Sequence, residues 1–115
     1  MAKMTNEMVA GMDTLVETAK EDYRNWMGRS GELTDTRKLM IARFEENFHY
    51  QAGSKYIKVI KDGSVHCFVV NTDTDKKFRK GDILKPASWA APARNFARGN
   101  VLDGDFSRIR WTSAM

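Results

Sequence analysis

The sequence is poor in cysteine, in proline and in long apolar runs. Its 115 residues contain one cysteine, Cys67, and two prolines. A single thiol excludes an internal disulfide framework and suits a reducing compartment. No run approaches the ~18 apolar residues that a transmembrane helix needs, and the N-terminal segment is charged, without the apolar core of a signal peptide. We therefore expect a soluble, intracellular protein without a membrane span.

The sequence also lacks recognisable catalytic motifs. It has no phosphate-binding loop, no dinucleotide-binding fingerprint and no nucleophile elbow. His66 and Cys67 are neighbours in an apparent strand, so their side chains are expected on opposite faces, outside hydrogen-bond reach. A buried structural cysteine beside a half-exposed histidine is the interpretation we favour. His49 is the other histidine, and its spacing from these residues matches no zinc site. We expect no catalytic residue.

Two short acidic tracts are candidates for metal binding: Asp73-Thr74-Asp75 and Asp103-Gly104-Asp105. Calcium loops need more oxygen ligands and a bidentate glutamate, which neither tract supplies. Aspartate and glycine are common in turns because they form local hydrogen bonds and tolerate unusual dihedral angles. We therefore expect turns at both tracts, and neither a metal nor a cofactor.

Charge is distributed unevenly along the chain. Residues 1–53 carry 7 basic and 9 acidic side chains, whereas residues 54–115 carry 12 basic and 6 acidic ones. Between Lys76 and Arg98, seven basic residues accompany a single acidic one, Asp82. Such a segment favours an acidic partner, which includes nucleic acid, an anionic protein face or a phosphorylated ligand. The alternative is a solvated basic face without a partner.

The spacing of apolar residues predicts two helices and then strands. The first helix should begin at Thr5 or Asn6, either of which can cap it, and end at Gly28. The second should run from about residue 34 to 51. The apolar faces that define them are Met8, Met12, Leu15, Val16, Ala19, Tyr23 and Trp26 in the first, and Met40, Ile41, Phe44 and Phe48 in the second.

The second half of the chain has the composition of β-structure. Residues 55–61 and 64–70 are β-branched and aromatic, and Asp62-Gly63 between them is typical of a type I′ hairpin turn. Residues 78–84 predict a third strand, and the alternation in residues 106–111 predicts an edge strand. We expect a single α+β domain over residues 1–115, with two N-terminal helices (1–53) packed on a small, mainly antiparallel sheet of three to four strands (54–115).

The long segment from Lys85 to Asn100 is expected to be an ordered loop. It carries two aromatic residues, Trp89 and Phe96, and two arginines, Arg94 and Arg98. Aromatic rings beside guanidinium groups can stack on bases and neutralise phosphates, as they do in single-strand binding proteins. Alternatively, the two rings close the open end of the sheet while the prolines stiffen the loop.

Three stretches of this half resemble a family of small, uncharacterised phage-encoded proteins. They are residues 55–60, the "SVH-x-FV" stretch of residues 64–69, and residues 81–100, which contain "GDILKPASW-x-APA" and "ARGN". The resemblance covers roughly residues 55–103, and residues 85–92 are its most specific part. It implies a phage source and expression in the cytoplasm of an infected bacterial host, and it carries no known activity.

Together these features predict a non-enzymatic phage accessory protein that binds nucleic acid, single-stranded or RNA, through a basic and aromatic surface. The alternatives are a module that binds and modulates a host protein, or a minor virion component; homo-oligomerisation is left open. The expected binding residues are Lys76, Lys77, Arg79, Lys80, Lys85, Trp89, Arg94, Phe96, Arg98, Arg108 and Arg110.

Overall fold

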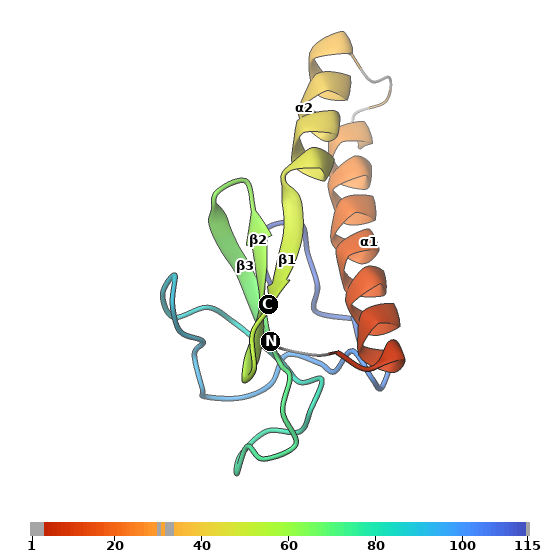
Figure 1. Cartoon of the computed structure of the whole chain (residues 1–115). Helices are drawn as coiled ribbons and strands as arrows, with labels where there is room; N and C mark the ends of the chain where they lie inside the picture. Colours follow the sequence, from red (N-terminus) through yellow and green to blue (C-terminus); the bar gives the residue numbers. More distant parts are fainter. Residues whose placement is uncertain (1–3, 30, 32–33, 115) are drawn as a thin grey trace.

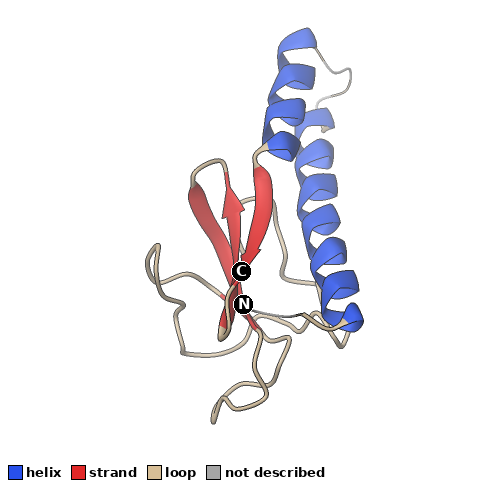
Figure 2. Ribbon diagram, in the orientation of Figure 1, coloured by secondary structure: helices blue, strands red, loops and turns tan. Residues whose placement is uncertain are grey.

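Two helices pack against one face of a four-stranded antiparallel sheet, which confirms the expected α+β class (Figures 1 and 2). The structure is a computed structural model that describes residues 4–29, 31 and 34–114. The helices are α1 (Asn6–Gly28) and α2 (Asp35–Glu46), and the strands are β1 (Phe48–Ala52), β2 (Tyr56–Lys61), β3 (Ser64–Val70) and β4 (Ile83–Leu84). The strands are ordered β1-β2-β3-β4 in the sheet, so each pairs with its neighbours in sequence.

Helix α1 forms where the sequence predicts it. The Thr5 hydroxyl accepts a hydrogen bond from the Met8 amide at 3.2 Å and so caps the first turn. The apolar face is buried as expected, except at its end, where Trp26 is 44% exposed and Met27 is buried in its place. Met8 and Trp26 are 18 residues apart, which is about five full turns, so the last turn of α1 buries a neighbouring side of the helix, next to Tyr23.

Helix α2 is shorter than predicted, and residues 48–52 form a strand. Thr34 caps the helix, which ends at Glu46. Strand β1 then pairs with β2 from Phe48↔Lys61 to Ala52↔Ile57. The expected helix to residue 51 was therefore wrong. The apolar spacing that suggested it mixes two elements, because Phe44 is buried from the helix and Phe48 from the strand. Met40 is largely exposed.

The β2–β3 hairpin confirms the predicted turn but contains a bulge that the sequence analysis missed. Asp62 and Gly63 have φ values of 44° and 85°, as a type I′ turn requires. Ile60 pairs with Val65 and Val59 pairs with Cys67, so His66 is the additional residue of a β-bulge. The bulge interrupts the alternation of side chains.

The bulge brings His66 and Cys67 together, which contradicts the expectation that they diverge. His66 Nδ1 lies 3.2 Å from Cys67 Sγ, and both residues are fully buried. The other ring nitrogen, Nε2, lies 2.6 Å from the carbonyl oxygen of Arg110. A carbonyl can only accept, so Nε2–H donates to it and the Cys67 thiol donates to Nδ1. His66 is thus an interior residue, not a half-exposed one.

Two other predicted strands are largely absent. Of residues 78–84, only Ile83 and Leu84 pair with β3. Residues 106–111 form no strand, and Ile109 makes an isolated bridge to Ala114. This segment instead supports the helices, since the Trp111 amide donates to the Asp22 carboxylate at 2.8 Å and the Trp111 ring packs against aromatic rings of both helices.

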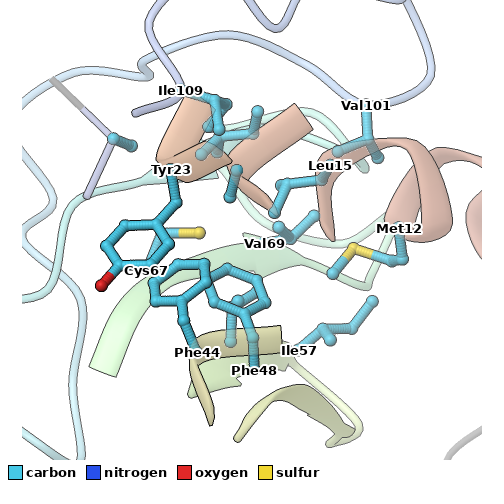
Figure 3. Close-up of a cluster of buried hydrophobic side chains, with 14 of the residues drawn as sticks. Met12, Leu15, Tyr23, Phe44, Phe48, Ile57, Cys67, Val69, Val101 and Ile109 are labelled. Atoms are coloured by element: carbon cyan, nitrogen blue, oxygen red, sulfur yellow. The ribbon is translucent and has the colours of Figure 1, made fainter. Parts of the chain in front are cut away.

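Both faces of the sheet are covered. The larger core lies between the sheet and α1, where Met12 and Leu15 of the helix pack with Ile57 and Val69 of the strands (Figure 3). The opposite face carries a second cluster of four buried residues, Phe68, Val70, Phe78 and Leu84. The long loop covers this second face, on the side away from the helices (Figure 1).

Within the described ranges 4–29, 31 and 34–114, neither helix combines the length and the apolar content that crossing a bilayer would take.

Candidate functional site

The loop of residues 85–98 is held in place by its own backbone. The Ala93 amide donates to the Lys85 carbonyl at 2.7 Å, and the Arg98 amide donates to the Ile83 carbonyl at 2.7 Å. Between these anchors the loop folds back on itself, because the amides of residues 87 and 88 both donate to the Ala91 carbonyl. A loop ordered in this way can present side chains in fixed positions. Its exposed large apolar side chains are Trp89, at 54%, and Phe96, at 50%.

Trp89 lies beside a lysine of the sheet. The ammonium group of Lys58, on β2, is 4.3 Å from the centroid of a Trp89 ring, which is cation–π distance. Lys58 is not among the binding residues predicted from the sequence. The alternation of β2 could have pointed to it, because Tyr56 and Lys58 must share the face that the loop covers.

Phe96 lies between two arginines. The Arg98 guanidinium carbon is 3.9 Å from the ring centroid, and that of Arg108 is 5.9 Å away on a separate segment. Arg98 is only 6% exposed, and its buried Nε–H has no hydrogen-bond partner among the described residues. Its one side-chain hydrogen bond is a long one, 3.4 Å, to the Asn95 side-chain oxygen. A buried cation with an unused donor is an unusual and costly feature.

Arg94 has a different environment, since it is locked in an ion pair. Its two terminal nitrogens bond both oxygens of Asp75 at 2.9 Å each, and Nη1 also donates to the Tyr56 hydroxyl at 2.6 Å. The Arg94 hydrogen bonds, together with the amides of Lys77 and Phe78, hold the pKa of Asp75 well below its usual range. Arg94 thus serves first to fix the loop against residues 75–78.

The remaining predicted residues differ in whether their charged groups already have partners within the protein. Lys77 donates to the Arg94 carbonyl and joins the same group. Arg79 is paired with Asp103 at 2.5 Å, so its charge is largely neutralised. The Arg110 guanidinium donates to carbonyls of its own segment, Ser107 and Ile109, and therefore does not join the loop residues. Lys76 and Lys85 are exposed, and Lys80 is half-buried.

The structure therefore brings the predicted residues together only in part. Lys77 and Arg94 form one group, and Phe96, Arg98 and Arg108 form another. Four cations either belong to this loop or lie over one of its exposed rings, and among the described residues no ion pair involves them: Lys58, Lys85, Arg98 and Arg108. We call these four cations, with Trp89 and Phe96, the loop surface.

The buried His66–Cys67 pair has the wrong electrostatics for a thiol nucleophile. Burial lowers the pKa of His66 to about 4, although its hydrogen bond to the Arg110 carbonyl acts in the opposite direction. Burial also raises the pKa of Cys67 far above its usual value. The neutral imidazole and neutral thiol hold β3 against the C-terminal segment. In the part of the chain that the structure describes, no three His, Cys, Asp or Glu side chains gather to hold a metal ion.

The chain matches a family model. Residues 1–112 fit the model of a family described as a family of unknown function (DUF7717). No curated protein matches the chain, and no solved structure matches it either.

Proposed function

The chain belongs to the DUF7717 family, and we propose that it is a non-enzymatic phage accessory protein that binds nucleic acid in the cytoplasm of the infected bacterial host. The ligand we propose is single-stranded nucleic acid or RNA, and the binding site is the loop surface. The proposal that the protein comes from a phage rests on the resemblance of residues 55–103 to small phage-encoded proteins.

The observation that carries the proposal is the pairing of exposed rings with cations on one ordered loop. Trp89 and Phe96 are each about half exposed, and each has a cation within 4.5 Å of its ring centroid. Unpaired bases stack on aromatic side chains without sequence preference, while neighbouring cations neutralise the phosphates. Both components occur here at fixed positions, which reduces the entropy lost on binding.

The buried guanidinium of Arg98 supports the same conclusion. It has no carboxylate partner among the described residues, and its Nε–H makes no hydrogen bond. A phosphate bound beside the exposed Phe96 ring would supply the negative charge that Arg98 lacks. Arg108 reaches the same ring from another segment, so two cations could share one phosphate.

The test is fluorescence anisotropy with a labelled single-stranded oligonucleotide, applied to Trp89→Ala and Phe96→Ala. Each lost stacking contact is worth about 1–3 kcal/mol, so each variant should bind about 5- to 150-fold more weakly.

Trp26→Ala is the matched control for these variants. Trp26 is also an exposed ring with a cation over it, Arg29 at 3.2 Å, but it lies at the far end of α1. Its removal should leave the affinity unchanged. If Trp26→Ala weakens binding as much as Trp89→Ala, or if neither loop variant weakens it, the loop surface is not the binding site.

The second candidate function is a module that binds and modulates a host protein. One observation favours it: Arg79 and Arg94 are already paired with Asp103 and Asp75, so fewer basic residues of this half of the chain are available to phosphates than the sequence suggests. Exposed aromatic and arginine side chains are also typical of protein–protein hot spots. A pull-down from host lysate distinguishes the two functions. A partner retained after nuclease treatment supports the second function, and one lost supports the first.

A further inference from the structure

A polar cleft of about 570 Å³ lies where the Thr72–Lys76 loop passes the start of β2. Its lining combines three cations and three hydroxyl groups: Lys55, Lys76, Arg94, Ser54, Thr72 and Thr74. None of these residues belongs to the loop surface as defined above. The cleft needs a separate explanation, because cations and hydroxyl donors on one concave wall are the groups that bind oxyanions.

The cleft is positively charged despite the aspartate in it. Asp75 is the single acidic residue of the lining, and its side chain is only 2% exposed. Its two oxygens accept from Arg94 and from the amides of Lys77 and Phe78. Among the described residues, no ion pair involves Lys55 or Lys76, so two positive charges in the cleft remain uncompensated.

Arg94 is held in a position from which it can still donate. An arginine has five N–H groups, and the ion pair with Asp75 and the bond to Tyr56 use three of those of Arg94. Within the described part of the chain, its Nε–H and one Nη2–H have no partner. Because Asp75 and Tyr56 already fix the guanidinium, little side-chain entropy is lost when these donors bind a ligand.

The hydroxyl groups add further donors. Thr72 and Thr74 share one hydrogen bond, 2.8 Å between their oxygens, which uses the proton of only one of them. The Ser54 hydroxyl is a further donor on this wall. One threonine proton and the serine proton are thus available on the same wall as the three cations.

We infer that this cleft binds the terminal phosphate of the nucleic-acid strand that lies on the loop surface. A terminal phosphate carries nearly two negative charges at neutral pH and three free oxygens, whereas a phosphate within the strand carries one charge. The two uncompensated lysines and the remaining donors of Arg94 suit the terminal group better. The inference rests on the proposed function, because it concerns an end of the same ligand.

The position of the cleft agrees with this assignment. Tyr56 bonds Arg94 at the edge of the cleft and shares a face of β2 with Lys58, which contacts Trp89. Two residues along a strand span about 7 Å. A nucleic-acid strand whose terminal phosphate lies in the cleft can therefore reach the Trp89 ring with a few nucleotides.

The experiment compares oligonucleotides that carry a 5′-phosphate, a 3′-phosphate or hydroxyls at both ends, with the full chain and anisotropy as the readout. One of the two phosphorylated ends should raise the affinity about tenfold over the hydroxyl form, as expected for a charged group held by new hydrogen bonds. Lys76→Ala should remove most of this preference. Lys76 is exposed and makes no ion pair among the described residues, so the variant should fold normally.

Lys38→Ala, which removes an exposed lysine of α2, is the matched control and should leave the preference intact. If all three oligonucleotides bind equally well, the cleft is not a terminal-phosphate site, and the loop surface remains a nucleic-acid binding site. The same conclusion follows if Lys38→Ala reduces the preference as much as Lys76→Ala does. If none of the oligonucleotides binds, the proposed function fails and this inference fails with it.

Discussion

Protonation of His66 should make the folded state less stable in mild acid. The residue is fully buried, and both of its ring nitrogens are engaged, Nε2 as a donor to the Arg110 carbonyl and Nδ1 as an acceptor from Cys67. A protonated ring would have to donate from Nδ1 towards a thiol in an apolar interior. The pKa of His66 is therefore lowered from 6.5 to about 4 by burial.

The direction and size of the change in stability with pH follow from the difference between the pKa of His66 in the unfolded and in the folded chain. Between about pH 6.5 and pH 4 the unfolded chain binds a proton at His66 and the folded chain does not, so the free energy of unfolding falls as the pH falls. Each pKa unit corresponds to about 1.4 kcal/mol, which gives about 3 kcal/mol over the whole window. Between pH 7 and pH 5, where few carboxylates titrate, the loss should be about 2 kcal/mol.

The assay is urea unfolding followed by tryptophan fluorescence at a series of pH values, for the wild type and for His66→Gln. Glutamine retains a donor but does not titrate, so the variant should be less stable throughout and nearly independent of pH from 7 to 5. The reasoning is refuted if the wild type loses no stability over this interval, or if His66→Gln loses as much.

Three further results are expected. Gly99→Ala should destabilise the fold more than Gly63→Ala in urea unfolding. Both positions have positive φ (139° and 85°), but a Cβ at Gly99 would lie 2.5 Å from a backbone oxygen, whereas a Cβ at Gly63 would meet nothing within 4 Å; equal losses would contradict this. Cys67 should resist alkylation by iodoacetamide at neutral pH until the protein unfolds, because burial raises the pKa of its thiol; fast modification of the folded chain would show that the site opens. Leu84→Ala should cost about 2–5 kcal/mol, since this fully buried side chain belongs to the small cluster under the loop; a loss below about 1 kcal/mol would mean that the loop does not seal that face.

Features set by local chemistry were predictable from the sequence. The Asp62-Gly63 turn needs positive φ at both residues, and few other pairs accept it. The caps at Thr5 and Thr34 likewise depend on one hydroxyl each. Features set by distant pairing were not predictable. Strand β1 exists because residues 48–52 pair with β2, and its apolar spacing alone fits a helix equally well.

The candidate site also contains residues that could be predicted from the sequence and residues that could not. The exposed rings Trp89 and Phe96 could be selected from composition, because aromatic side chains in a basic loop are uncommon. Their partners could not all be selected. Lys58 is distant in sequence from Trp89, and only the sheet brings the two together. The pairing of Arg94 with Asp75 is equally non-local, and it changes Arg94 from a free cation into a structural one.

The salt dependence of binding to a labelled single-stranded oligonucleotide tests the central claim most directly. Four cations of the loop surface make no ion pair among the described residues. If Arg98 and Arg108 share one phosphate and Lys58 and Lys85 neutralise one each, the logarithm of the association constant should fall with the logarithm of the salt concentration with a slope of about −2. Absence of binding even at low salt, or binding with a slope near zero, would contradict a nucleic-acid role for this surface.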